Sequence, residues 1–237
     1  MLESPKGEAV ENSGFANVVL PAPSVSGTMR SRMSFAIQHM LAAARFSRQC
    51  AGVERAHIGK NIDYFFDEIM HSCNAAVLLA VASLEANINE VFFDKDQHFL
   101  EQSPDLLKEM WRLLARKSIL EKYQAVMVLK GVEKLDQSKP PYQDVEALIQ
   151  ARNALVHFKP EWDDEQKALK DVATKLEGKF PFSPFMDSGA PKFPHRCMGH
   201  GFSSWAVRCS LHFMEVFHQS ADIPHKFSIY VGGLDPA

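Results

Sequence analysis

Apolar residues recur at three- and four-residue steps along most of this chain, which is the pattern of helices that bury one face. A first helix is expected at about residues 28–50, and a second, the longest, at residues 61–93. The second carries one apolar stripe, formed by Ile69, Cys73, Val77, Ala80, Leu84, Ile88 and Val91. Residues 75–84 are apolar on nearly all sides, which predicts a helix enclosed by other helices.

Four further helices are expected downstream. Ser103-Pro104 is a favourable helix start, so a helix is predicted from Pro104 to about Lys117, with a continuation after a kink to Leu129. The stretch 144–160, DVEALIQARNALVHFKP, predicts a helix that Pro160 ends. Acidic residues at 163–165 indicate the first turn of another helix. A last helix is expected at residues 202–219.

The remaining segments lack a helical period. Residues 1–27 are expected to form a loose arm with one docked strand at 15–20, and residues 180–194 an irregular loop rich in proline and aromatic residues. The sequence FSIYV within 223–232 indicates a short strand. The prediction is an all-α protein: an irregular antiparallel bundle of about five or six helices over residues 28–222, between an N-terminal arm and a C-terminal tail, 223–237.

Composition changes this picture little. The 237 residues are 46% apolar, enough for one domain with a sizeable core. The net charge of -3 gives no global attraction to nucleic acid, so an RNA contact would need a local basic patch. Lys108, Arg112 and Arg116 supply one at i, i+4 and i+8. Such a stripe is more often a solvated helix face.

The cysteine pattern favours a cytoplasmic protein with reduced thiols, because no signal peptide precedes the four cysteines. The longest uncharged run, Ile69 to Leu84, is short for a membrane span, so no membrane contact is expected. Two Cys-x-x-His pairs are the only zinc-like spacing: Cys197/His200 and Cys209/His212. The second pair lies in an apolar helix, where both residues suit packing. We therefore expect no metal and no cofactor.

Arg152, Asn153 and His157 are the main candidates for chemistry. An arginine offers a permanent charge with a forked donor geometry that suits phosphate, and a histidine transfers protons near neutral pH. At about 100° per residue, positions five apart diverge by roughly 140°. A site shared between two copies of the chain is therefore favoured over a self-contained one. The alternative is that both residues simply cap and pair at the helix end.

Glu85 and Asn89 are candidate supporting residues. They are four apart, so they share one helix face, and Glu85 emerges from the enclosed part of the long helix. A buried carboxylate needs a partner. We expect Glu85 to contact Arg152 or neighbours of that helix, and Asn89 to bond across the bundle. The alternative for Glu85 is a structural ion pair unrelated to chemistry.

The sequence R-N-A-L-V-H at 152–157 resembles the R-x4-H motif of HEPN (higher eukaryotes and prokaryotes nucleotide-binding) domains. The stretch SLEANINEVFF at 83–93 is similar to the long preceding helix of several prokaryotic HEPN-like families. The resemblance covers about residues 60–160. It implies a bundle of four to five helices that dimerises and brings two motifs together across a cleft.

Active members of that family are metal-independent endoribonucleases, used in toxin–antitoxin and defence systems. By this resemblance Arg152 steadies the scissile phosphate, His157 transfers a proton at the ribose 2′-hydroxyl or the leaving oxygen, and Asn153 orients one of them. A homodimer, an RNA substrate and an antitoxin or other protein partner are the expected partners. Other members have lost activity and bind a protein or a nucleotide instead, so a non-catalytic module remains the alternative.

Overall fold

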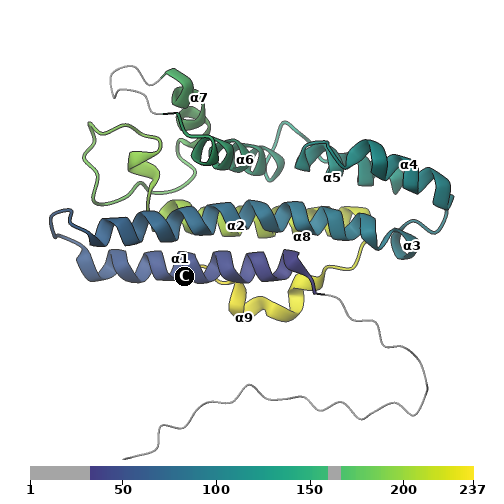
Figure 1. Cartoon of the computed structure of the whole chain (residues 1–237), viewed down its shortest axis with the longest axis horizontal. Coiled ribbons are helices and arrows are strands. Elements are labelled where there is room, and N and C mark those ends of the chain that lie inside the picture. The colour runs from purple at the N-terminus through teal and green to yellow at the C-terminus, as the bar shows by residue number, and fades with distance from the viewer. Residues whose placement is uncertain (1–32, 160–166) are drawn as a thin grey trace, which may run out of the picture. The chain divides into compact units, whose positions relative to one another are not determined.

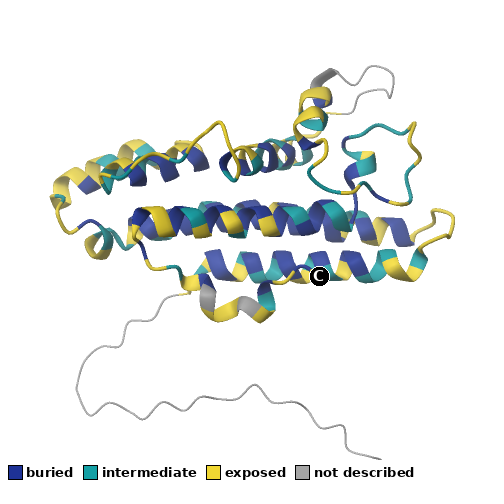
Figure 2. Cartoon of the chain, turned by 180° about the vertical axis from the view of Figure 1, so that it is seen from behind, coloured by how far each residue is buried: buried dark blue, intermediate teal, exposed yellow. Residues whose placement is uncertain are grey.

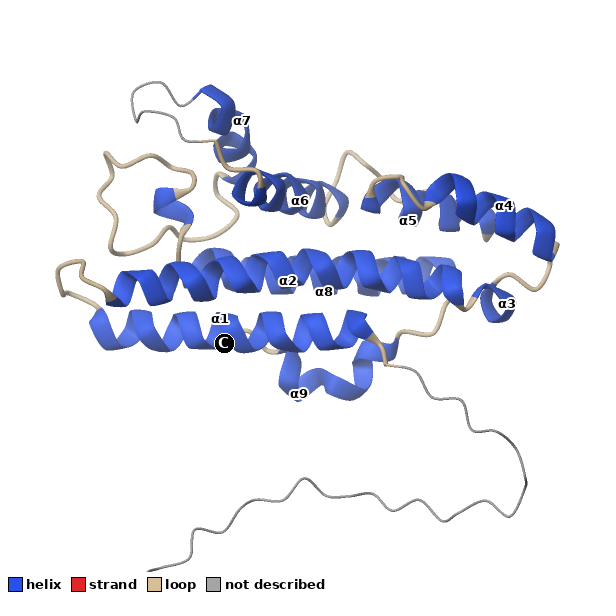
Figure 3. Ribbon diagram, in the orientation of Figure 1, coloured by secondary structure: helices blue, strands red, loops and turns tan. Residues whose placement is uncertain are grey.

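The computed structural model describes residues 33–159 and 167–237. The chain divides into two units, Met1–Met33 and Ser34–Ala237, and the second is described below. Every regular element in the described ranges is a helix, with no strand (Figure 1; Figure 3). The all-α prediction is therefore confirmed.

Three long helices form the centre of the bundle: α1 (Phe35–His57), α2 (Phe65–Phe93) and α8 (His200–Ala221). Each packs against the other two (Figure 1). The backbone nitrogen of His200, at the start of α8, lies 2.7 Å from Glu54 Oε1 near the end of α1. Near the ends of α2 and α8, Asn87 bonds to His218. Thus α1 is antiparallel to both partners, as expected, whereas α2 and α8 run parallel.

The apolar stripe predicted for α2 is buried along its whole length, from Ile69 to Val91. Burial on both sides of the helix follows from its position between α1 and α8 on one side and the outer helices on the other. Ser83, also fully buried, donates a 2.7 Å hydrogen bond to the carbonyl oxygen of Ala36 on α1. A small side chain at this position lets the two backbones approach closely.

Both ends of α1 differ from the sequence prediction. The Ser34 hydroxyl caps the helix by accepting from the backbone nitrogen of Ile37. Glu90 of α2 adds a carboxylate there, 2.9 Å from Ser34 Oγ and 3.0 Å from the nitrogen of Ala36, where the helix dipole favours negative charge. The helix continues through Gly52 to His57 because residues on both sides of that glycine pack against the core.

A second layer covers the face formed by α2 and α8. It consists of α5 (Ile119–Leu129) and α6 (Tyr142–Val156), preceded by the short α3 (Lys95–His98) and by α4 (Pro104–Leu114). The predicted kinked continuation from α4 into α5 is wrong. Ser118 and Glu121 form a capping box that starts a separate helix. On the outer side of α4 most residues are exposed (Figure 2).

After α6 come α7 (Lys167–Leu176) and the 3-10 turn His195–Cys197. The acidic first turn predicted at 163–165 lies outside the described residues, as does the strand predicted at 15–20. Residues 180–194 are irregular, as expected, but their aromatic side chains pack inward. Phe180 stacks on Phe202 with ring centroids 4.9 Å apart, and Phe193 is fully buried.

The strand predicted within 223–232 is wrong. Residues Lys226–Tyr230 form a 3-10 helix and Val231–Leu234 the short helix α9. The described part of the chain offers no other strand to pair with this segment, so its polar backbone groups need local bonds. Nor is this segment a free tail: α9 packs against α1, and Arg48 of α1 donates to the carbonyl oxygen of Gly233 at 3.2 Å.

Candidate functional site

The C-terminal end of α6 carries the three predicted catalytic residues. The helix is anchored by a buried face of Val145, Leu148 and Ala151, which faces the core. It ends at Val156, shortly before the predicted end near Phe158 or Lys159, and His157 follows as the C-cap with its backbone nitrogen 2.9 Å from Asn153 O. The core face fixes the helix, so the residues beyond it project from a rigid support.

Arg152 lies at the border between core and solvent. The residue is partly buried, and within residues 33–159 and 167–237 its Nε is buried with no hydrogen-bond partner. A buried N–H without an acceptor costs free energy, on the order of 1–3 kcal/mol. That cost disappears when an acceptor such as a phosphate oxygen reaches the group.

Asn153 and His157 are both exposed. Within residues 33–159 and 167–237 no hydrogen bond or ion pair joins either side chain to Arg152. The lack of a bond between these side chains agrees with the roughly 140° divergence expected for a five-residue step on a helix. The pairing of guanidinium and imidazole across two copies of the chain stays a prediction. His157 and Asn153 are therefore accessible to a ligand, whereas the Nε of Arg152 is buried in this structure. Val156 and Phe158, on either side of His157, are 51% and 44% exposed.

Glu85 and Asn89 converge on a residue that the sequence reading missed, Lys122 of α5. The Lys122 ammonium lies 3.2 Å from Asn89 Oδ1 and 3.7 Å from Glu85 Oε1. Asn89 therefore bonds across the bundle, as predicted. The partner of Glu85 is Lys122 rather than Arg152, and the Glu85 side chain is 47% exposed rather than enclosed. These two residues hold α5 against α2 and do not touch the α6 residues by any described bond.

Lys122 itself is 2% exposed, which is unusual for a lysine. The ring of Trp111 lies 5.9 Å from its ammonium and helps to cover it. A signal was available in the sequence: position 122 falls on the same helix face as Ile119, Tyr123 and Val126. A lysine on an otherwise apolar face needs a buried partner, and Asn89 supplies it.

The basic stripe is a solvated surface. Lys108, Arg112 and Arg116 are all exposed. Arg112 is held by Glu109, with Nε 3.0 Å from Oε1 and 2.9 Å from Oε2. Arg116 lies past the end of α4, so the regular i, i+4, i+8 spacing does not extend to it. The three side chains therefore do not form one continuous unpaired row of positive charge.

The two Cys-x-x-His pairs do not converge. Cys197 donates to the carbonyl oxygen of Lys192 at 3.1 Å, and His200 Nδ1 is 3.5 Å from Ser47 Oγ. Cys209 is buried in α8, whereas His212 is exposed. Among the described residues, no group of three or more His, Cys, Asp or Glu side chains is arranged to hold a metal ion.

A buried polar network, not foreseen from the sequence, joins α2, α5 and α8. Tyr123 Oη lies 2.9 Å from Asn87 Oδ1, and Asn87 Nδ2 lies 3.1 Å from His218 Nε2. The other ring nitrogen of His218 is 3.3 Å from the carbonyl oxygen of Ile223. Burial, reinforced by the neighbouring His225, lowers the pKa of His218 to about 4. The network is structural, because its residues are buried and its polar groups satisfy one another, although Asn87 and His218 also line a small pocket.

Comparison of the chain with protein-family models, with curated proteins and with solved structures finds no match. α2 is the one helix in the described ranges long and apolar enough to cross a membrane. A core helix passes the same test, and 56% of its most apolar window is buried inside the protein. The function must therefore be argued from the α6 residues themselves.

Proposed function

We propose that the protein acts on RNA, with Arg152, Asn153 and His157 as a phosphate-handling site of HEPN type. The observation that carries the proposal is the Arg152 side chain. It is a permanent cation whose buried Nε has no partner among the residues that the structure describes, and it lies beside two exposed polar residues at one helix end. Once the Arg152 side chain turns outward, a phosphodiester supplies an acceptor for Nε and the negative charge that balances the guanidinium.

The proposed reaction is metal-independent cleavage by the ribose 2′-hydroxyl. The 2′-oxygen attacks the adjacent phosphorus while His157 accepts its proton, and Arg152 stabilises the negative charge on the phosphate. The bond to the 5′-oxygen of the next nucleotide breaks, and that oxygen takes up a proton. The products are a 2′,3′-cyclic phosphate and a free 5′-hydroxyl. Asn153 orients the phosphate or the imidazole.

A homodimer supports this chemistry. Val156 and Phe158 expose apolar surface on both sides of His157, which a second copy of the chain would cover. A two-fold axis beside this helix end would bring a second motif to the same phosphate. One imidazole could then accept the 2′-hydroxyl proton while the other protonates the leaving oxygen. A toxin–antitoxin or defence role would add a protein inhibitor as a further partner.

The test is RNA cleavage by purified protein in the presence of EDTA. We expect 2′,3′-cyclic phosphate ends, and a loss of roughly a hundredfold or more in rate with Arg152→Ala or His157→Ala. Matched controls are Arg45→Ala and His212→Ala, which remove the same side chains from exposed positions elsewhere. Cleavage that vanishes with EDTA but survives His157→Ala would reject the proposal.

One observation favours the second candidate, a non-catalytic interaction module. On α4 only Leu107 is buried, while Leu106 and Leu113 are 45% and 54% exposed. The aromatic segment 180–193 is the other candidate for a partner surface, but its rings are occupied by contacts within the fold. A protein without nuclease activity, whose stable partner is lost on Leu106→Ser with Leu113→Ser, would support this candidate instead.

A further inference from the structure

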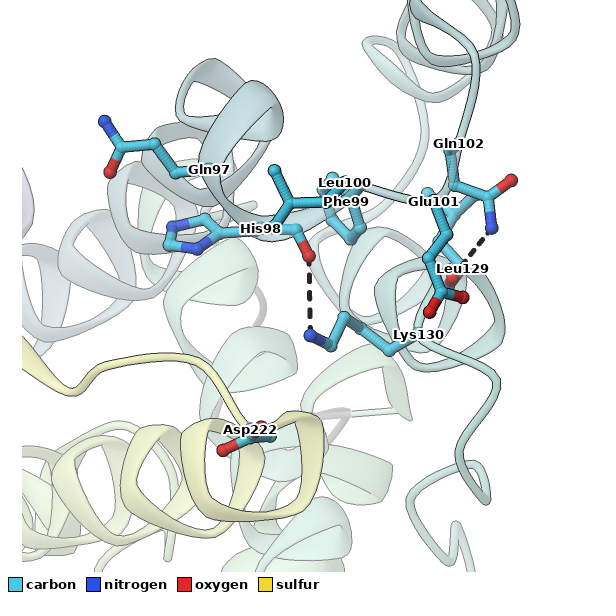
Figure 4. A pocket seen from close by; sticks show the side chains of 9 residues that line it. All are labelled: Gln97, His98, Phe99, Leu100, Glu101, Gln102, Leu129, Lys130 and Asp222. Carbon is cyan, nitrogen blue, oxygen red and sulfur yellow. Dashed lines mark hydrogen bonds between the residues drawn. The ribbon is translucent and has the colours of Figure 1, made fainter.

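A cavity of about 360 Å³ lies away from the α6 residues, where three helices end. Its walls come from the end of α3, the segment leading into α4, the end of α5 and the residue after α8 (Figure 4). Small-molecule sites in proteins have volumes of about 300–1,000 Å³. The cavity is therefore large enough for a metabolite of modest size.

The cavity wall carries opposite charges that do not neutralise one another. Lys130, partly buried, donates to the carbonyl oxygen of His98 at 3.4 Å. In the part of the chain that the structure describes, no ion pair within 4 Å joins Lys130 to Glu101 or Asp222, although all three line the cavity. In Figure 4 the Lys130 ammonium turns toward His98, apart from both carboxylates.

The C-terminal end of α8 adds to the negative charge on the cavity wall. Asp222 is the C-cap of α8, a helix of 22 residues, and it adopts a left-handed conformation with φ of 50°. The C-terminal end of such a helix carries partial negative charge, which adds to the Asp222 carboxylate. On the other wall Gln102 Nε2 is 3.5 Å from the carbonyl oxygen of Leu129, which leaves the Gln102 amide oxygen as an acceptor.

We propose that this cavity binds a small zwitterion of the α-amino acid class. Lys130 binds the ligand carboxylate, whereas Asp222 at the end of α8 binds its ammonium group, so two charges that form no ion pair with each other in the described residues are matched within one ligand. The side chain of the ligand lies toward Leu100, which is 83% exposed at the cavity mouth. The site is separate from the Arg152 and His157 site and does not depend on its chemistry.

The test is a thermal-shift screen of the full chain against the twenty α-amino acids at 10 mM, followed by calorimetric titration of any that bind. Each amino acid is paired with its N-acetyl form, which lacks the ammonium, and its amide, which lacks the carboxylate. We expect at least one free amino acid to raise the melting temperature and both of its blocked forms to fail. No shift with any free amino acid would overturn the proposal, as would an equal shift with the blocked forms.

Two variants then assign the groups. Lys130→Met and Asp222→Asn should each weaken binding about tenfold or more, since each removes a charge-assisted contact. Lys60→Met and Asp67→Asn make the same changes at exposed positions outside the cavity and should leave affinity unchanged. Circular dichroism confirms that each variant is folded. Binding that is unaffected by both cavity variants would contradict the assignment of this cavity.

Discussion

The Lys122 ammonium of α5 donates a 3.2 Å hydrogen bond to Asn89 Oδ1 of α2. This bond joins an outer helix to the centre of the bundle, and it gives a 2% exposed lysine its closest acceptor. Glu85, 3.7 Å away and half exposed, contributes less because solvent screens it. Asn89 is therefore the residue on which the burial of Lys122 depends.

Asn89→Leu should destabilise the fold by about 1–3 kcal/mol, because a buried ammonium loses its closest acceptor. Lys122→Met should cost less, about 1 kcal/mol, because the ammonium itself is removed and the apolar stem is kept. Urea unfolding of both variants and of the double variant measures the coupling. Gln143→Leu, an exposed amide elsewhere, is the control. Equal and additive losses would contradict the pairing.

Two glycines offer a matched pair of substitutions. A Cβ on Gly201, near the start of α8, would lie 2.2 Å from the carbonyl oxygen of Pro181, whereas a Cβ on Gly52 within α1 would meet nothing within 4 Å. Gly201→Ala should therefore cost about 2 kcal/mol or more. Gly52→Ala should stabilise by about 0.5–1 kcal/mol, because alanine favours the helix. Thermal unfolding of both variants is the measurement. A Gly201→Ala protein as stable as the parent would contradict the prediction and show that the loop carrying Pro181 moves to make room for the added Cβ.

His218 should make the fold sensitive to acid. Burial and the nearby His225 lower its pKa from 6.5 to about 4 in the folded protein, so the unfolded chain takes up the proton first. Stability is thus complete above pH 6.5 and falls as the pH drops toward 4, by up to about 3 kcal/mol. His98 and Lys226 oppose the imidazolium as well, and the hydrogen bond to Ile223 O favours it.

The measurement is the free energy of unfolding between pH 7 and pH 5, in the parent protein and in His218→Gln. We expect a smaller loss in the variant, with the remainder due in part to His225, whose pKa is lowered in the same direction by burial. An NMR titration of His218 in the parent gives an independent check if the variant is poorly folded. A His218 titration near its usual pKa would contradict the prediction.

The helices were largely predictable because each is decided by local periodicity. The stripe from Ile69 to Val91 is buried as expected, and the helix that carries Arg152 ends within two residues of the predicted position. The conformation of the C-terminal FSIYV segment was not predictable in this way. A strand needs a partner strand elsewhere in the chain, and local periodicity does not show whether one exists. Likewise Ser118 starts a new helix through a reciprocal cap that outweighs the continuous apolar pattern.

At the candidate site, too, the features set by local sequence were predictable and those set by packing were not. The sequence placed Asn153 and His157 at a helix end, and the structure leaves both exposed there. The sequence alone could not identify Lys122 as the partner of Glu85, because the register between α2 and α5 depends on the packing of both helices. Nor could it reveal the orphaned Nε of Arg152, which depends on how deeply α6 sits in the bundle.

One face of helix α1 is covered by residues that the ribosome adds much later. α2 can fold back on it at once, but Ser47 meets Ser203 across 156 positions and Arg48 meets Gly233 across 185. During synthesis the apolar flank of α1 that α8 and α9 cover therefore stays exposed until residues 200–234 have emerged. At about 5–20 residues per second, that interval is on the order of ten seconds or more, long enough for a chaperone to hold the nascent hairpin.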